Sequence, residues 1–306
     1  MDTSQRIAYG EAITKLADTN DKIVVLDADL SHATMTNIFA KAHPDRFFNM
    51  GIAEGNMVLA AAGFAHTGLI PFVSTFAVFG AGRAFEQIRN SVCYANANVK
   101  FALTHSGLSV GEDGGSHQAI EDIAIMRALP NMTILVPCDP IETAKAVAAA
   151  IEIKGPVYIR IARPLVKNIT TEQTPFVPGK GTILQDGTDV CIITAGLMTP
   201  IALEAAQMLQ KDDLSVAVVN MHTIKPIDKE LILNMAAKCK GIVTAEEHSV
   251  IGGLGSAVAE VLAGNSSCKF KMIGVEDKFG RSGAPDLLFE EYGLTKENIY
   301  NACLFN

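Results

Sequence analysis

Short apolar runs that alternate with helical patterns constrain the fold of this chain more than any other feature. The first run is IVVLDAD, residues 23–29, in which four apolar residues end in two carboxylates. A run this short and without polar alternation is typical of a strand buried on both faces, as in a helix-covered parallel sheet. Similar runs recur at 70–74, 99–104, 132–136 and 156–161.

Helical patterns separate these runs, at 3–18, 54–66, 80–95, 118–128 and 140–153. The alternation predicts a doubly wound, mostly parallel α/β domain. The Ala-rich helix 54–66 carries an apolar stripe of small and large residues, and we expect this stripe to face another subunit. Its members are Met57, Ala60, Ala61 and Phe64.

A second, smaller α/β unit is predicted after a stretch rich in Pro, Gly and Thr. We therefore divide the chain into a first domain at 1–165, a linker at 166–188 and a second domain at 189–306. The second domain contains IGGLGSA, residues 251–257. This is not a dinucleotide fingerprint, because Val258 stands where that pattern needs Gly or Ala, so we expect tight helix packing or anion binding at a helix N-terminus.

Composition excludes several classes of protein. Hydrophobic residues make up 49% and charged residues 19%, which excludes a disordered chain. The net charge of −8 argues against a nucleic-acid or membrane-surface partner. The six cysteines form no C-x-x-C pair, and the sequence has neither a signal-peptide pattern nor a long apolar span. We therefore expect a cytoplasmic protein with reduced cysteines.

Glu54, Phe76 and Phe79 are the first candidates for chemistry. Glu54 lies at the predicted start of a helix, where a carboxylate either favours the helix dipole or, with a raised pKa, exchanges protons with a ligand. Phe76 and Phe79 are three residues apart in STFAVF and form either core packing or a flat wall for a heteroaromatic ring.

The segment THSGLSVGEDGGSHQ, residues 104–118, is a long polar loop after a predicted strand. In open α/β sheets such loops bind ligands, and this one suits a hydroxylated molecule. His105 and His117 are too far apart in sequence for a helical metal pair, so we expect no metal site in this chain. Arg160 and Arg163, at the exit of another strand, suit phosphate recognition or a surface ion pair.

Together these segments resemble the C-terminal half of the transketolase family, along essentially the whole chain. GIAEGNM at 51–57 is similar to the catalytic-glutamate segment, STFAVF to the cofactor-stacking segment, and the loop at 104–118 to the sugar-channel segment. GIVTAEEH and IGGLGSA are similar to the family's last domain. The resemblance implies a thiamine diphosphate pyrimidine-binding domain followed by a transketolase C-terminal domain.

The resemblance also implies roles for individual residues. Glu54 would hydrogen-bond the aminopyrimidine of thiamine diphosphate and act in catalysis, together with His105 and His117. Further cofactor contacts are implied at Ile52, Phe76, Phe79 and Asp29. The sugar substrate would be held by His105, His117, Asp113 and Arg160.

The family's Mg²⁺-binding Gly-Asp-Gly segment is missing from this sequence. We therefore expect a separate N-terminal subunit that holds Mg²⁺ and the diphosphate, in an α₂β₂ assembly. Three positions depart from the family pattern: Ser106 replaces an Asp, Gly82 a Tyr, and Ala33 a phosphate-binding Ser.

The resemblance thus predicts one subunit of a two-chain transketolase, which moves a two-carbon ketol unit from a ketose to an aldose, with or without phosphate groups. One alternative is a 2-oxoacid dehydrogenase β subunit or a deoxyxylulose-phosphate-synthase-like enzyme; the GED-G-SHQ loop argues against the dehydrogenase. Another is a non-catalytic partner protein, against which Glu54 and both Phe residues argue.

Overall fold

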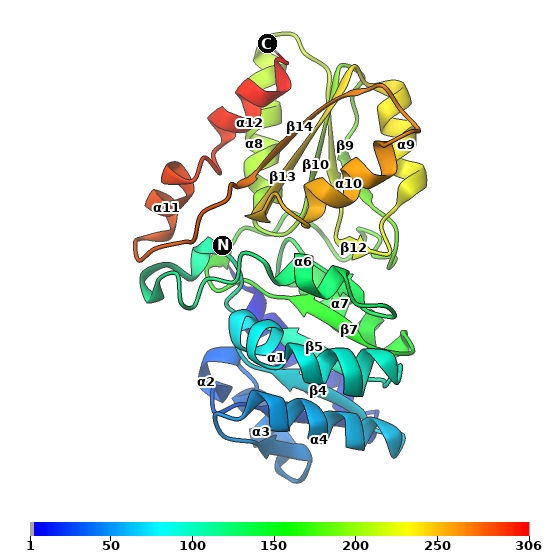
Figure 1. Cartoon of the computed structure of the whole chain (residues 1–306), viewed down its shortest axis with the longest axis vertical. Coiled ribbons are helices and arrows are strands. Elements are labelled where there is room, and N and C mark those ends of the chain that lie inside the picture. The colour runs from blue at the N-terminus through cyan, green and yellow to red at the C-terminus, as the bar shows by residue number, and fades with distance from the viewer. Residues whose placement is uncertain (1–2, 306) are drawn as a thin grey trace.

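The structure is a computed structural model that describes residues 3–305, and it contains two α/β units stacked along the long axis (Figure 1). The larger, N-terminal unit is built on a seven-stranded sheet with the order β12-β6-β7-β5-β4-β2-β3. Its strands are β2 (Ile23–Asp27), β3 (Phe47–Asn49), β4 (Ile70–Ser74), β5 (Lys100–Leu103), β6 (Thr133–Leu135) and β7 (Val157–Arg160), all parallel, with β12 (Thr223–Lys225) antiparallel at one edge.

The alternation of side chains along β2 shows why its apolar run is unbroken. Val24 and Leu26 enter one hydrophobic core, while Ile23 and Val25 enter the core on the opposite face. Because helices cover both faces, every position of the strand is buried. The helices are α1 (Gln5–Ala17), α2 (Ser31–Thr34), α3 (Asn37–Ala42), α4 (Glu54–His66), α5 (Phe85–Gln87), α6 (Asp122–Arg127) and α7 (Pro140–Glu152), with 3₁₀ turns η1 (Pro44–Arg46) and η4 (Leu108–Asp113).

The helix expected at 80–95 is replaced by wider turns. Two π-helical segments, η2 (Val78–Arg83) and η3 (Ile88–Tyr94), flank the single turn α5. π-Helical insertions are uncommon and often occur at functional sites. Here the first of them carries Phe79.

The second unit is a five-stranded sheet with the order β14-β13-β10-β11-β9. The strands are β9 (Thr182–Gln185), β10 (Val190–Thr194), β11 (Val216–Asn220), β13 (Gly241–Ser249) and β14 (Lys269–Val275), all parallel except β9. Its helices are α8 (Met198–Lys211), α9 (Lys229–Lys238), α10 (Leu254–Leu262), α11 (Pro285–Glu291) and α12 (Lys296–Cys303). The observed fold confirms the predicted class, two mostly parallel α/β units. Sequence analysis missed α12, and it assigned β9 to the linker.

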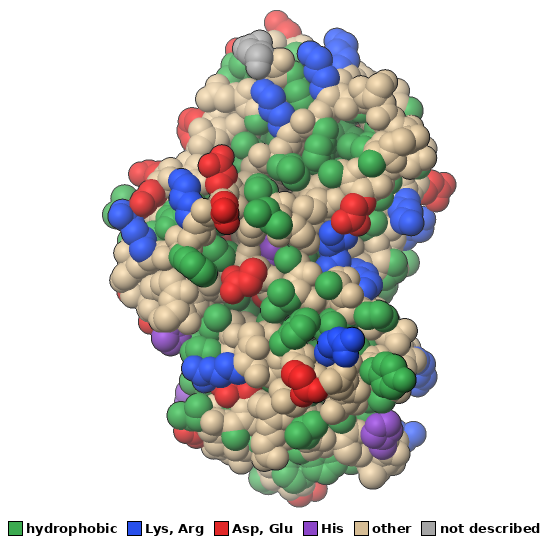
Figure 2. Space-filling model, viewed as in Figure 1, with side chains coloured by type: hydrophobic (Ala, Val, Ile, Leu, Met, Phe, Trp, Pro, Cys, Tyr) green, Lys and Arg blue, Asp and Glu red, His purple; other side chains and the backbone are tan. Residues whose placement is uncertain are grey.

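The two units share secondary structure. Strand β12 belongs in sequence to the second unit but pairs with β6 of the first, with Thr223 opposite Leu135. Near the junction of the two units, β1 (Thr3–Ser4) pairs with β8 (Leu165–Val166), so the start of the chain is tied to the exit from the first domain (Figure 1). Charges of both signs are interspersed over the face shown in Figure 2. Among residues 3–305, no helix combines the length and apolarity that crossing a membrane requires.

The apolar stripe of α4 is buried to different degrees along its length, and its contact with another subunit stays a prediction. Met57 and Ala61 are fully buried in the chain's own core. Phe64 packs on Phe48, with ring centres 5.0 Å apart. Met57 and Ala61 therefore cover the sheet of their own domain, as periodic apolar stripes usually do, while Ala60 and Phe64 are half-buried.

Candidate functional site

The carboxyl ends of β4 and β5 bring two sequence-distant segments together. These strands are parallel neighbours, and just beyond them Phe76 forms an isolated bridge with Thr104. His105 follows in the left-handed backbone region, with φ of 56°, which turns the chain sharply at this edge. The rings of Phe76 and His105 stack with their centres 3.8 Å apart. The edge of the sheet is where open α/β folds bind ligands.

Phe79 and His117 extend this aromatic cluster. Phe79 stacks on Phe76 at 5.7 Å with an interplanar angle of 15°. His117, at the far end of the loop, meets Phe79 edge-on at 5.2 Å. Phe76 and Phe79 thus come from the segment after β4, and His105 and His117 come from the polar loop after β5. Each segment contributes two rings to one aromatic surface.

Glu54 lies beside this surface as the first residue of α4. Its side chain is only 6% exposed, and Oε1 accepts a hydrogen bond from Arg83 at 3.0 Å. Both readings of Glu54 are compatible with its position, since the helix N-terminus favours its charge. Burial, however, exceeds what a helix dipole requires and costs desolvation of the carboxylate, which is typical of a group that serves a ligand.

Arg83 joins the carboxylate to the aromatic surface, and sequence analysis missed it. Its guanidinium carbon lies 4.1 Å from the centre of the Phe79 ring, while Nη1 donates to Glu54. The side chain is 54% exposed, so it is not locked in place. Its spacing of four residues from Phe79, at the start of the helix predicted over 80–95, was a signal that the two side chains could meet.

His105 is held neutral. Burial, followed by the charges of Arg6, Arg163 and His117, lowers the pKa of His105 to about 3. Its Nδ1 lies 2.9 Å from the hydroxyl of Thr104, which fixes the orientation of the ring. A neutral imidazole at this position can donate or accept one hydrogen bond from a hydroxylated ligand. Arg6 and Arg163 are further residues that enter the electrostatics of the site.

Three further residues expected at the site are exposed. Asp113 is exposed at the end of η4. Ile52 is 77% exposed on the loop before α4. Asp29 is also exposed, just past the end of β2, and accepts a hydrogen bond from Asn49 at 2.9 Å.

Arg160 is committed to the junction of the two domains. It is 5% exposed, and its Nε and Nη2 donate to Asp122 at 2.7 and 3.2 Å. Nη2 also reaches the carbonyl oxygens of Ala119 and Glu247. Arg160 therefore makes a buried ion pair, which neither of its two sequence-based interpretations, phosphate recognition and a surface ion pair, had included, and these contacts occupy donors that a phosphate would need.

The glycine-rich turn 251–257 binds the side chain of an acidic residue that precedes it in the chain. Glu246 of β13 accepts hydrogen bonds from the backbone N–H groups of Leu254 and Gly255, at 2.7 and 2.8 Å, at the N-terminus of α10. A Cβ on Gly253 would collide with this carboxylate, which explains the glycine. The N-terminus of α10 therefore holds an acidic group, as expected for this turn, and the group is a side chain of the protein itself.

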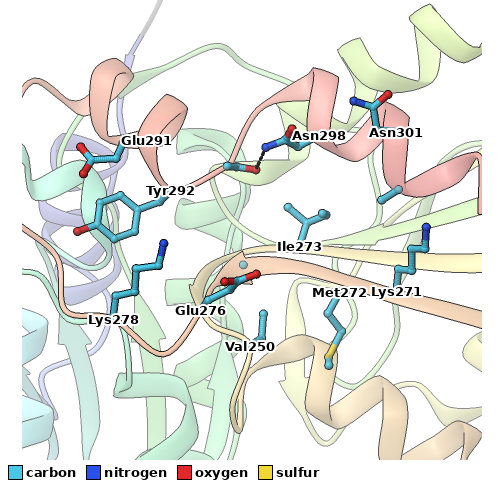
Figure 3. Close-up of a pocket in the computed structure, with 13 residues that line it drawn as sticks. Val250, Lys271, Met272, Ile273, Glu276, Lys278, Glu291, Tyr292, Asn298 and Asn301 are labelled. Carbon is cyan, nitrogen blue, oxygen red and sulfur yellow. Dashed lines mark hydrogen bonds between the residues drawn. The ribbon is translucent and has the colours of Figure 1, made fainter. Parts of the chain in front are cut away.

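A separate cavity of about 620 Å³ lies in the second domain. Figure 3 shows its walls, which are Lys271, Met272 and Ile273 on β14, Glu291 at the end of α11, Tyr292 just after it, and Asn298 and Asn301 on α12. None of the residues expected at the site lines it. It also lacks a buried carboxylate beside an aromatic surface, and we place the candidate site in the first domain.

Comparison with known proteins matches both domains. The model of the transketolase pyrimidine-binding domain matches residues 2–168, and that of the transketolase C-terminal domain matches residues 179–299. A putative transketolase C-terminal section from Methanocaldococcus jannaschii is 50% identical over 298 residues, which cover 96% of this chain and 93% of that protein.

Two further relatives differ in length. A solved structure of a split gene transketolase, described as an inactive beta4 tetramer, superposes with a TM-score of 0.91 at 52% identity, covering 99% of this chain and 98% of that one. Transketolase from Rattus norvegicus is 40% identical over 97% of this chain, but the match covers only 48% of the rat protein. The sequence, the fold and these relatives agree that this chain belongs to the transketolase family.

Proposed function

We infer that this chain is the C-terminal subunit of a two-chain transketolase, which transfers a two-carbon ketol unit from a ketose or ketose phosphate to an aldose or aldose phosphate. The observation that carries this proposal is the buried carboxylate of Glu54 beside the aromatic surface of Phe79. The high coverage of a C-terminal section, and the half coverage of a full-length transketolase, support the division into two chains.

The residues present fit thiamine diphosphate. Arg83 already places a planar group with N–H donors against both Glu54 and Phe79, which indicates that a flat, nitrogen-containing ring of similar thickness fits the same two contacts. When bound, the cofactor would supply an electron sink for cleavage of a carbon–carbon bond. Arg83 must then leave, and its half-exposed side chain permits this.

Each residue of the cluster has a defined task in this proposal. Glu54 holds or releases a proton at its carboxylate toward the ring nitrogen of the cofactor. Phe76 and Phe79 orient the ring and exclude water. His105, neutral at pH 7, and His117 hydrogen-bond the oxygens of the sugar. Because Arg160 is committed to Asp122, we assign it no contact with substrate.

The partner in this proposal is an N-terminal subunit that carries the Gly-Asp-Gly segment, Mg²⁺ and the diphosphate site, in an α₂β₂ assembly. Mg²⁺ prefers carboxylate and carbonyl oxygens together with phosphate, which such a segment provides. We also assign the subunit to the cytoplasm, in keeping with its six free cysteines.

Reconstitution tests the proposal. The chain is mixed with an N-terminal transketolase subunit, thiamine diphosphate and Mg²⁺, and transfer from a ketose phosphate to an aldose phosphate is measured, with pyruvate as the competing donor. Glu54→Gln should keep the circular dichroism spectrum and lose about a hundredfold or more of the turnover. The exposed Glu86, changed to Gln, is the matched control. Full activity of Glu54→Gln, or activity with pyruvate alone, would contradict the assignment.

A further inference from the structure

A buried carboxylate from the second domain lies beneath the polar loop of the first. Glu247, on β13, is 3% exposed, and its Oε1 accepts a hydrogen bond from the backbone N–H of Ser109 at 2.5 Å. The approach is so close that a Cβ on Gly107 would lie 2.3 Å from the same oxygen. Glycine is therefore required at position 107, both for this contact and for its φ of 77°.

The second domain also holds the other end of the loop. Gln118 donates to the carbonyl oxygens of Leu108 and Gly111 inside the loop, and to that of Arg281 in the second domain at 2.9 Å. Ser282 donates to the carbonyl oxygen of Glu112 at 2.6 Å. The loop that carries His105 and His117 is thus clamped between two parts of the second domain.

Stability alone does not account for Glu247. Its Oε2 has no hydrogen-bond partner, and burial raises the pKa of its carboxyl to about 7. The neighbouring cation, Arg160, donates to the carboxylate of Asp122. Its hydrogen bond to Glu247 goes to the backbone carbonyl oxygen and not to the side chain. A half-satisfied buried carboxylate is a poor source of folding free energy, so its geometric contact with the loop is the more informative feature.

We propose that Glu247 is a positioning residue, through which the second domain sets the shape of loop 105–118 for the sugar substrate. Its carboxylate fixes Ser109, at the beginning of η4, and thereby the path between His105 and Asp113. The identity of the substrate rests on the proposed function; the effect of Glu247 on the loop does not.

Glu246 provides a matched control on the neighbouring position of the same strand. It is equally buried at 2% exposed, its pKa is also raised to about 7 by burial, and it too accepts backbone hydrogen bonds. Its donors are the backbone N–H groups of Leu254 and Gly255, which belong to the second domain itself. Loss of Glu246 should therefore weaken the second domain without altering the loop.

The experiment compares Glu247→Ala, Glu247→Gln and Glu246→Ala by hydrogen exchange of peptide 104–118 in the full chain, and by the KM and kcat for ketose in the reconstituted enzyme. Glu247→Ala should accelerate exchange at Ser109, and raise the ketose KM, by about tenfold, because the buried hydrogen bond from the Ser109 N–H to the carboxyl group is lost. The dissociation constant of thiamine diphosphate should stay unchanged. Glu247→Gln, which retains an acceptor oxygen, should restore most of both values.

Three outcomes would overturn the proposal. They are unchanged exchange of the loop in both Glu247 variants, equal acceleration in Glu246→Ala, and a loss of kcat with no change in ketose KM. If Glu247→Ala does not fold, Glu247→Gln decides alone: a small acceleration of exchange at Ser109 together with a small rise in the ketose KM supports the proposal, and wild-type exchange, with or without a changed KM, refutes it. Failure of the wild-type enzyme to transfer any ketol unit would instead reject the proposed function, while the exchange result would still decide the role of Glu247.

Discussion

Separating Arg83 from Glu54 tests the geometry of the candidate site in the isolated chain. At 3.0 Å, two unit charges in an effective dielectric of about 20 attract each other by about 5 kcal/mol before desolvation and side-chain entropy are counted. Arg83 is 54% exposed and therefore screened by water, whereas Glu54 is almost fully buried. The net coupling should lie between surface and buried ion pairs, at about 1–2 kcal/mol.

A double-mutant cycle measures this coupling by urea unfolding of the wild type, Arg83→Ala, Glu54→Gln and the double variant. Arg83→Ala should destabilise the chain more than Glu54→Gln, because it leaves a buried carboxylate without its partner. The surface pair Lys240–Asp189, 2.8 Å apart, is the control and should couple much more weakly. A coupling below about 0.3 kcal/mol would be simple additivity, and it would refute the ion pair and with it our argument for the shape of the cofactor site.

Three further predictions concern stability. Burial lowers the pKa of His222 to about 4, so the unfolded chain binds this proton first, and His222 alone should contribute about 3 kcal/mol to the loss of stability as the pH drops from about 6.5 to about 4; urea unfolding across this range should show a loss smaller by this amount in His222→Asn than in the wild type, and an equal loss in both would contradict the burial of His222. Ala61→Glu places a charge at a position with no exposure and should abolish the cooperative melting seen by circular dichroism; a variant that melts as the wild type does would contradict the place of Ala61 in the core. Lys100 is fully buried and donates to Asn98 and to the carbonyl oxygens of Ile153 and Gly155. Lys100→Met should therefore lower the free energy of unfolding by about 3 kcal/mol, and an unchanged value would contradict these contacts.

Local patterns were sufficient for most of the fold. The buried runs at 23–29 and 70–74 carried a clear signal, because strands with helices on both faces have no polar positions. The turns at 80–95 could not be predicted, since α- and π-helical turns share nearly the same apolar spacing. Strand β12 was not predicted for a different reason. Its pairing partner β6 lies about 90 residues away along the chain, and only the tertiary structure brings the two strands together.

The same limit applies to the candidate site. Glu54, Phe76, Phe79, His105 and His117 were found because each lies in a recognisable segment, and the structure gathers them. For Arg160, the sequence indicated only that an arginine stands at the end of a predicted strand. Whether such a residue faces solvent or a buried acid depends on Asp122, which carries no local signal of its own.

The short strand β12 also limits how this molecule can be divided. A fragment ending in the 166–188 segment would leave β6 as an open sheet edge, whose bare N–H and C=O groups would recruit strands from other molecules. Such a fragment should aggregate, and it would also lose the part of the hydrophobic core that the second unit supplies. For protein engineering, the smallest transplantable module is therefore the whole chain. A fusion to another polypeptide belongs at its ends and not between its domains.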